Sequence, residues 1–474
     1  MEPSVSPPYR GLPPLAGIAT MEEAMRPGLS VDECVARIKR YHYALRRLHQ
    51  IFTDRIPAEP IYELKMAYSL HAHICAEHVA AFAARVGEMR EPPLGLDGVP
   101  DPALEVFFDE ILAAPSTADT VAALYGRAIP ALRAALQRHL AQTNPLADHP
   151  TARLCRFALL ELADVDRFGA EAVAHLVDEA ARGGMEAWLG GLDAALAAAG
   201  ALDGADVPAG PVPDRRRSAA PHAFDGTPRR DARFADPYNM AVNAEAFLYD
   251  ERYAPKPKTL MMYYKRLREI DVPEVMAAII AETPGKDWPY YRDMSRQLWD
   301  EARHALMGEV GFASLGIDWP RLVRVNHTWS LGLNTQLTAL DRHAVLFFIE
   351  QGLMPRTGKR FEWEVASASG DPLSRLFQDF DWADEVLHAR IGRDWYVSQI
   401  GDFRRAMERG DRCWSSVLID WRQWREQGLT EHANWWPALY REACARWGEA
   451  PDPEALAFDT SYEGQRADLK GVSG

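Results

Sequence analysis

The sequence predicts an all-α protein built from two helical bundles in tandem. Apolar residues recur with helical periodicity through both halves of the chain, as in "RAIPALRAALQRHLAQ" at 127–142. No stretch shows the series of short alternating segments that a sheet would need. A stretch dense in Pro, Gly, Asp and Arg separates the two halves, which is typical of a linker.

These features divide the chain into five parts, in the order in which they follow one another. We expect an N-terminal extension, a first helical domain, a linker, a second helical domain and a Trp-rich helical segment with a tail, at 1–29, 30–200, 201–237, 238–405 and 406–474. A chain of 474 residues is too long for one ordinary core, which favours this division.

Composition excludes several classes of protein. The formal net charge of −15 argues against a general nucleic-acid binder, because such proteins need a basic surface to neutralise phosphates. No run of about 18 apolar residues is present, so we expect no membrane span, and we see no signal peptide. The 5 cysteines are scattered and form no CxxC pair, which favours a reducing, cytoplasmic location.

Four helices are expected in the second domain. Asp lies at the start of three of them, and each of these three has Pro in its first turn. The predicted helices are 271–283, 287–312, 338–354 (continued through 361–369) and 370–400. Short connections join the first to the second and the third to the fourth, whereas a longer segment links the two hairpins and could cross the bundle.

Two of these helices carry a Glu-x-x-His pair. "WDEARHALMGE" contains Glu301 and His304, and "DEVLHARIG" contains Glu385 and His388. Residues three apart lie on one face of a helix, so each pair presents a carboxylate and an imidazole together. One such pair is common by chance, but two pairs on alternate helices point to a metal site.

The other two helices each supply a carboxylate. Glu350 follows a run of apolar residues, where an unpaired carboxylate would be costly. Glu274 precedes Glu301 by 27 positions, and Glu350 precedes Glu385 by 35, as helical hairpins require. We therefore predict Glu274 as the ligand from the first helix and keep Glu269 as the alternative.

The predicted ligand set is Glu274, Glu301, His304, Glu350, Glu385 and His388. Four carboxylates and two imidazoles suit iron or manganese and neutralise two divalent ions. The set does not choose between Fe/Fe, Mn/Mn and Fe/Mn. Asp300 and Asp384 are expected to accept the outer N–H of a ligand histidine from a neighbouring helix. His343 lies two turns before Glu350 on the same face of the helix. We expect it to be either an extra metal ligand or a residue that lines the pocket.

This arrangement resembles the ferritin-like di-metal carboxylate superfamily over about 258–400. The resemblance implies a four-helix bundle with two metal ions, most often iron, and O2 as co-substrate. The superfamily includes iron stores, peroxidases and oxygenases, so the resemblance alone does not give the reaction. The length of the chain and its Trp-rich C-terminal segment favour an oxidase or oxygenase, such as a monooxygenase, that acts on a small organic substrate in specialised metabolism. Because the chain has no CxxC motifs for an electron-transfer module, reducing equivalents would come from an external donor or from the substrate.

The first domain resembles a degenerate copy of the second and is expected to lack metal. Cys75 and His78 occupy the positions that correspond to Glu301 and His304. Asp164 and Arg167 occupy those that correspond to Glu385 and His388. Two other functions stay open: a non-catalytic metal-binding or scaffold protein, and an RNA-modifying hydroxylase. A homodimer is compatible with the sequence.

Overall fold

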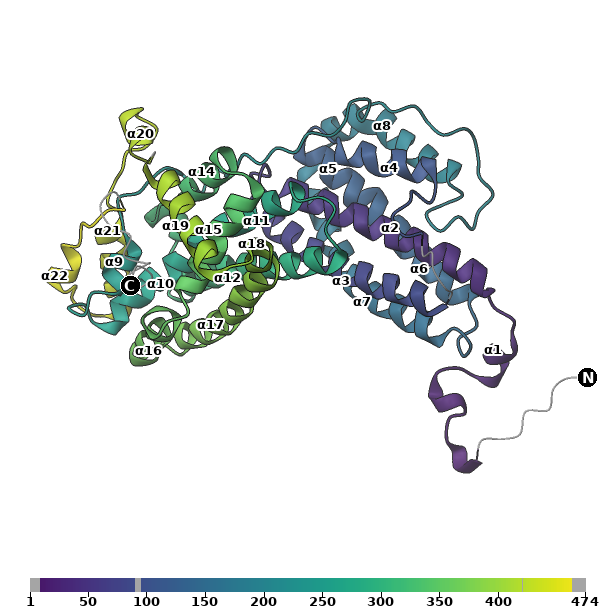
Figure 1. Ribbon diagram of the computed structural model, residues 1–474, viewed down its shortest axis with the longest axis horizontal. Coiled ribbons are helices and arrows are strands. Elements are labelled where there is room, and N and C mark those ends of the chain that lie inside the picture. The colour runs from purple at the N-terminus through teal and green to yellow at the C-terminus, as the bar shows by residue number, and fades with distance from the viewer. Residues whose placement is uncertain (1–8, 90–94, 420, 463–474) are drawn as a thin grey trace, which may run out of the picture. The chain divides into compact units, whose positions relative to one another are not determined.

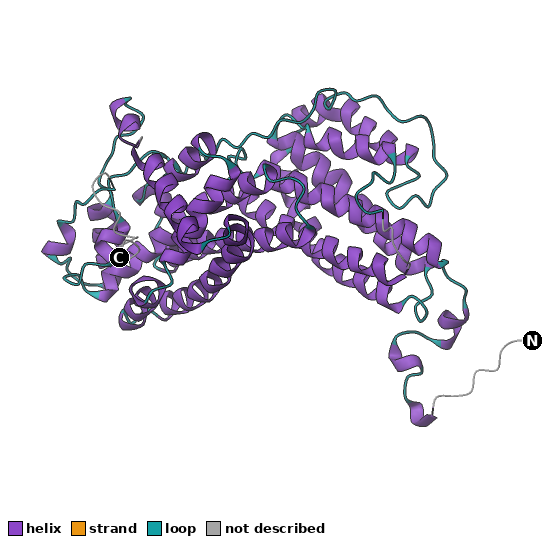
Figure 2. Ribbon diagram, in the orientation of Figure 1, coloured by secondary structure: helices purple, strands orange, loops and turns teal. Residues whose placement is uncertain are grey.

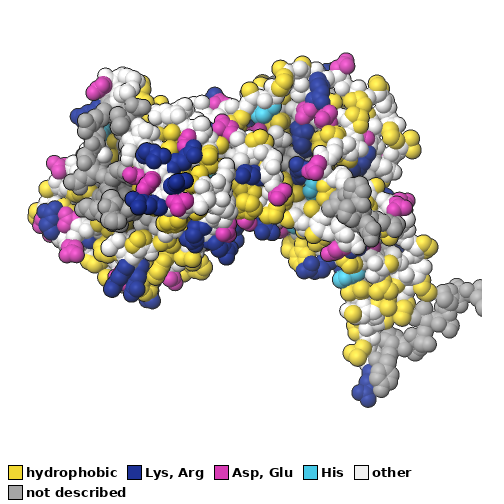
Figure 3. Space-filling model, viewed as in Figure 1, with side chains coloured by type: hydrophobic (Ala, Val, Ile, Leu, Met, Phe, Trp, Pro, Cys, Tyr) yellow, Lys and Arg dark blue, Asp and Glu magenta, His cyan; other side chains and the backbone are white. Residues whose placement is uncertain are grey.

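The computed structural model describes residues 9–89, 95–419 and 421–462 (Figure 1). Within these ranges every regular element is a helix, which confirms the all-α prediction (Figure 2). No helix in the described part of the chain is long and apolar enough to cross a membrane. On the face drawn in Figure 3, Lys and Arg side chains are interspersed with Asp and Glu side chains.

The chain forms two compact units, and their boundaries differ from the predicted domains. The first unit comprises 1–51 and 74–223, and the second comprises 52–73 and 224–474. Residues 52–73, expected in the first domain, therefore belong to the second unit. The predicted linker divides at residue 223, and the Trp-rich segment is part of the second unit.

The first unit is built mainly from seven helices, two of which also enter the second unit. They are α2 (Val31–Arg55), α3 (Tyr62–Met89), α4 (Pro102–Leu112), α5 (Thr117–Ala123), α6 (Ile129–Gln142), α7 (His149–Leu176) and α8 (Glu179–Ala198). α1 (Met21–Met25) precedes them. A capping box at its start, formed by Thr20 and Glu23, explains why this short helix begins there.

The second unit contains the four predicted helices, with shifted ends. They are α11 (Asp271–Ala281), α12 (Trp288–Ser314), α15 (Ala339–Gly352) and α17 (Pro372–Gly392), and the predicted continuation is α16 (Phe361–Ala368). Asp371 caps α17 by accepting backbone N–H bonds from Leu373 and Ser374. α12 packs against α11 and α17, and α15 packs against α11 and α17 as well.

One further long helix, α10 (Pro255–Arg268), was not predicted. Its sequence "KRLR" is typical of an exposed cationic end, yet Lys265, Arg266 and Arg268 are buried. Each of these cations faces a carboxylate from elsewhere in the unit, which offsets the cost of burial. α10 packs along α12, and a break at residues 269 and 270 separates it from α11.

Eight further helices in the described residues complete the second unit around this core. They are α9 (Ala244–Leu248), α13 (Trp319–Leu322), α14 (Thr328–Gln336), α18 (Ser398–Ile400), α19 (Phe403–Ile419), α20 (Trp421–Glu426), α21 (Trp436–Trp447) and α22 (Pro453–Leu456). In the Trp-rich segment, Trp414 and Trp436 are fully buried and act as core anchors. The tail at 463–474 lies outside the described residues.

Candidate metal centre

Both Glu-x-x-His pairs are buried and face each other between α12 and α17. The helical spacing places Glu301 and His304 on the side of α12 that packs against α17, where Glu385 and His388 lie. His388 Nδ1 is 3.0 Å from Glu301 Oε1. The two motifs, which are 84 positions apart in the sequence, therefore form one cluster.

The cluster consists of two groups of four ligand-type side chains that share Glu385. Within each group, ligand atoms lie within 4.8 Å of one another. The Glu350 group comprises Glu301, Glu350, Glu385 and His388, and the Glu269 group comprises Glu269, His304, Asp381 and Glu385. Glu301 also approaches the second group, because its Oε2 is 3.6 Å from His304 Nδ1. Two carboxylates are thus placed to bridge the groups.

Several buried atoms of these groups are arranged as if to hold a cation. Within the described part of the chain, five of them make no hydrogen bond of good geometry: Glu269 Oε2, Glu301 Oε1, His304 Nδ1, Glu385 Oε2 and His388 Nδ1. Four of these atoms lie only at ion-pair distance from one another, with His388 Nδ1 3.0 Å from Glu301 Oε1 and His304 Nδ1 3.4 Å from Glu269 Oε2. Buried polar atoms are nearly always satisfied in proteins, so five exceptions in one place require an explanation. Oxygen and imidazole nitrogen atoms are the donors that iron and manganese accept, so the residues fit such an ion.

Each histidine is oriented by an aspartate from the opposite helix. His304 Nε2 lies 3.1 Å from Asp384 Oδ2, and His388 Nε2 lies 3.4 Å from Asp300 Oδ2. Arg303 donates to both aspartates and ties them together. With Nε2–H donated outward, the Nδ1 atom of each ring is directed at the carboxylates, where a metal ligand is needed. Asp300 and Asp384 thus each contact a ligand-type histidine of the neighbouring helix.

Two buried cations contact the Glu269 group. Lys359 Nζ lies 2.8 Å from Glu385 Oε1 and 2.9 Å from Asp381. Arg266 pairs with Asp381 and with Glu269, at 2.8 Å from the latter's Oε1. Burial would raise the pKa of Glu269, but Arg266 and Lys359 hold it at about 2. This half of the cluster is therefore largely neutralised by the protein itself.

The position of Lys359 depends on a close backbone approach. It belongs to a short π-helical turn, Arg356–Arg360, between α15 and α16. A Cβ atom on Gly358 would lie 2.2 Å from the carbonyl oxygen of Leu353, which is closer than any real Cβ contact. Only glycine lets the chain turn here and bring Lys359 into the interior.

The Glu350 group is compensated less, because Lys359 pairs with only one of its members, the shared Glu385. Gln297 donates a hydrogen bond of 3.1 Å to Glu350 Oε1, but an amide carries no charge. Burial, together with the nearby Glu385 and Glu301 carboxylates, raises the pKa of Glu350 well above its usual range. A divalent cation here would remove that repulsion. We therefore infer that the Glu350 group has the stronger demand for a metal ion.

The structure corrects the expectation for Glu274. Its buried carboxylate pairs with Lys65 and with Arg230, whose Nη2 is 3.0 Å from Oε2, and it accepts a 2.6 Å bond from Ser330. It belongs to neither ligand group. The alternative, Glu269, lies at the break between α10 and α11. It belongs to a ligand group together with His304, Asp381 and Glu385.

Two further differences concern Asp381 and His343. Asp381 was not predicted, although it lies four positions before Glu385 and seven before His388, on the same helical face. His343 belongs to neither group: its ring packs 5.5 Å from that of Tyr396 and 6.4 Å from that of Tyr290. Burial lowers the pKa of His343 to about 4. The structure thus places it among aromatic rings instead of ligands.

The first unit has no equivalent cluster among its described residues. Asp164 and Arg167 pair with each other on the surface, and His78 Nε2 lies 2.6 Å from Glu161. Cys34, His139 and Asp148 do come together there. Asp148 is, however, fully engaged, since it also accepts hydrogen bonds from Thr143, Thr151 and Arg85.

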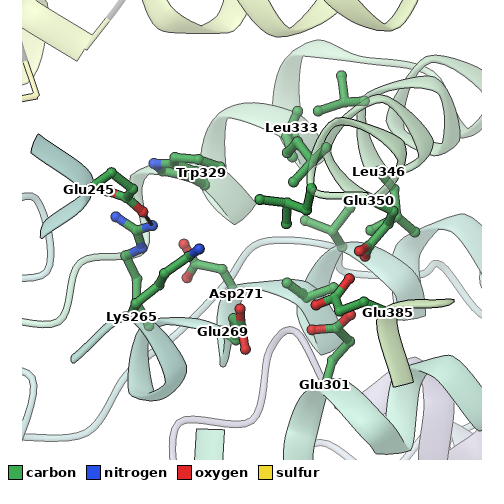
Figure 4. A pocket seen from close by; sticks show the side chains of 16 residues that line it. Glu245, Lys265, Glu269, Asp271, Glu301, Trp329, Leu333, Leu346, Glu350 and Glu385 are labelled. Atoms are coloured by element: carbon green, nitrogen blue, oxygen red, sulfur yellow. Dashed lines mark hydrogen bonds and ion pairs between the residues drawn. The ribbon is translucent and has the colours of Figure 1, made fainter. Parts of the chain in front are cut away.

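A pocket of about 90 Å³ opens beside the cluster in the second unit. Figure 4 shows Glu301, Glu350 and Glu385 at one end, and Glu245 and Trp329 at the other. The ligand-type carboxylates therefore border a space that a small molecule can enter. Such an arrangement, with apolar walls and a few polar groups, is typical of small-molecule sites.

Comparison with protein-family models, with curated proteins and with solved structures finds no match for this chain. The functional assignment therefore rests on the site itself.

Proposed function

We propose that this protein is a non-haem di-metal oxidase or oxygenase that binds two iron ions and uses O2 to oxidise a small organic substrate. The supporting observation is the set of five buried ligand-type atoms that converge in two groups and make no hydrogen bond of good geometry among the described residues. Fe/Mn and Mn/Mn occupancy suit the same donors.

We also propose a ferritin-like arrangement for the second unit. Its ligands come from the α10–α11 break, α12, α15 and α17, and two of these helices carry Glu-x-x-His pairs. Carboxylates from two helices and Glu-x-x-His motifs from two others are the ligand pattern of di-iron carboxylate bundles. The first unit would be a second bundle that has lost this ligand set.

Two ferrous ions held by these residues would supply electrons to O2 together. The residues of the protein would orient the metal ligands and form the pocket beside them. Asp300 and Asp384 fix the two imidazoles, and the carboxylates of Glu301 and Glu385 lie between the two groups. The apolar wall of the pocket offers few hydrogen-bonding groups to water beside the carboxylates. Further reducing equivalents would come from a separate donor or from the substrate.

Anaerobic loading with Fe(II), followed by exposure to O2, tests this proposal. We expect two iron ions per chain by metal analysis and an O2-dependent absorbance change in the near-ultraviolet or visible range. The same protein loaded with Zn(II), which has no redox chemistry, serves as the control and should show no change. Absence of bound iron and manganese after loading would refute the proposal.

A non-catalytic metal-binding or structural role is the second candidate, because Lys359 and Arg266 already neutralise the Glu269 group. A cluster of this kind could stabilise the fold with one metal ion or with none. The number of ions bound and their relative affinities separate the two candidates.

Lys359→Met is expected to tighten binding of the ion in the Glu269 group by about tenfold or more. The ammonium lies within 2.9 Å of two ligand carboxylates, and a charge at such a distance repels a nearby cation by several kcal/mol even at an effective dielectric constant of about 20. Titration of metal-free protein with Mn(II), followed by electron paramagnetic resonance, measures both affinities. Lys286→Met, on the surface side of the unit, is the control. Unchanged affinity in Lys359→Met would contradict the assigned role of this lysine.

A further inference from the structure

The pocket beside the cluster has one apolar wall and one polar end. Its wall is formed by aliphatic side chains of α11, α14 and α15, among them Val275, Leu333, Leu346 and Ile349. This wall leads to Glu350, so the carboxylate cluster lies at its far side (Figure 4). A ligand that fills the pocket must therefore have an apolar body directed toward the cluster.

The cations at the polar end are already occupied. Lys265 Nζ donates to Glu362 at 2.5 Å. Arg268 is paired with Glu245 at 2.5 Å and with the hydroxyl of Tyr462, and its guanidinium lies 5.1 Å from the Trp329 ring. Neither cation needs an anionic ligand. A carboxylate or phosphate head group would have to displace existing buried ion pairs, which is unfavourable.

Asp271 is the group at this end with one oxygen that lacks a hydrogen-bond donor. Its Oδ1 accepts from Arg230 and, at 3.3 Å, from Ser330. Its Oδ2 has no hydrogen-bond donor among the described residues, although the residue is only 5% exposed and borders the pocket. Leaving a buried acceptor of this kind unsatisfied is unfavourable, and a donor on the ligand would remove that penalty.

The charges lining the pocket favour a cation as that donor. Six carboxylates border it, against two basic side chains: Glu245, Glu269, Asp271, Glu301, Glu350 and Glu385 against Lys265 and Arg268. Three further buried cations, Arg230, Arg266 and Lys359, pair with Asp271, Glu269 and Glu385. A hydroxyl could satisfy Asp271 Oδ2 as a donor, but an ammonium group makes the stronger, charge-assisted hydrogen bond to a carboxylate oxygen.

We propose that the pocket binds a small aliphatic amine, whose ammonium group donates to Asp271 Oδ2 while its carbon chain lies along the apolar wall toward Glu350. The proposal names the substrate class of the oxidase proposed above and rests on that function for the reaction. The binding mode itself uses Asp271 and the apolar wall, neither of which belongs to the ligand groups.

Isothermal titration calorimetry with the full-length protein tests the proposal, with n-hexylamine, 1-hexanol and hexanoate as probes. Both metal-free and Mn(II)-loaded protein are titrated. We expect one n-hexylamine per chain, bound at least tenfold more tightly than the alcohol or the carboxylate. Equal or tighter binding of 1-hexanol or hexanoate, or no binding of n-hexylamine, would overturn the proposal.

Asp271→Asn should weaken n-hexylamine binding at least tenfold, whereas Asp287→Asn at the start of α12 should leave it unchanged. Leu346→Phe, which narrows the apolar wall and keeps Asp271, should also weaken it at least tenfold. This second variant tests the binding mode even if Asp271→Asn does not fold. Unchanged affinity in a folded Asp271→Asn or in Leu346→Phe contradicts the binding mode. Amine binding by protein that takes up no metal would leave the pocket assignment standing and refute only the oxidase.

Discussion

Glu301→Gln is expected to lower the metal content of the protein by more than about tenfold while the helical fold is retained. The two oxygens of Glu301 face the two histidines, with Oε1 3.0 Å from His388 Nδ1 and Oε2 3.6 Å from His304 Nδ1. A glutamine keeps the shape but loses the charge and one of the two oxygens. Loss of a residue that only hydrogen-bonds to a metal ligand already lowers metal affinity roughly 10–100-fold. Loss of a ligand that both groups share should lower the affinity at least as much.

Metal analysis after Fe(II) or Mn(II) loading measures this effect, and circular dichroism monitors the fold. Glu309→Gln provides the matched control, because Glu309 lies on the same helix, α12, and belongs to neither ligand group. Full metal content in Glu301→Gln would show that this carboxylate is not a ligand. Equal loss in both variants would indicate damage to α12 instead of to the site.

Glu274→Gln is expected to lower the free energy of unfolding by about 3 kcal/mol or more, without changing the number of metal ions bound by the folded protein. The side chains of Glu274 and Lys65 are both fully buried, and they form an ion pair beside Arg230. Removing one partner of a buried pair leaves an uncompensated charge, which typically costs about 3–5 kcal/mol. Urea denaturation followed by fluorescence gives the change in stability.

A double variant separates this ion-pair explanation from a general packing defect. Lys65→Met combined with Glu274→Gln removes both charges, so it should be more stable than Glu274→Gln alone. A Glu274→Gln protein that keeps its stability but loses one metal ion would restore Glu274 as a ligand and exclude the assignment of Glu269.

The local pattern was sufficient to find most of the cluster. Glu301–His304 and Glu385–His388 follow from helical spacing alone, because residues three apart share a face whatever lies around them. Glu350 was found because a carboxylate inside an apolar run needs a partner. The all-helical fold follows from the same periodicity.

What could not be predicted depends on contacts between distant segments. Glu274 and Glu269 both precede α12 at suitable spacings, and the choice between them is made by Lys65 and Arg230, which lie 209 and 44 positions from Glu274. Nothing in the local pattern around these two cations indicates that they are buried.

Asp381, by contrast, could have been found from the sequence. It stands one turn before Glu385, just as Gln297 stands one turn before Glu301, so the two ligand helices repeat the spacing 297–301–304 and 381–385–388. Extending the face of each helix by one turn would have identified both positions.

The lysine inserted by the turn at Gly358 has a consequence for how the protein matures. Many small metalloproteins fold only when the metal ion binds, because the like-charged ligand side chains of the metal-free site repel one another. Here Lys359 and Arg266 stand in for part of that charge, so the polypeptide can complete folding first and acquire its metal afterwards. In the metalloenzyme proposed above, the order of assembly would then be set by the protein chain, and metal supply would govern activity without governing the survival of the newly made protein.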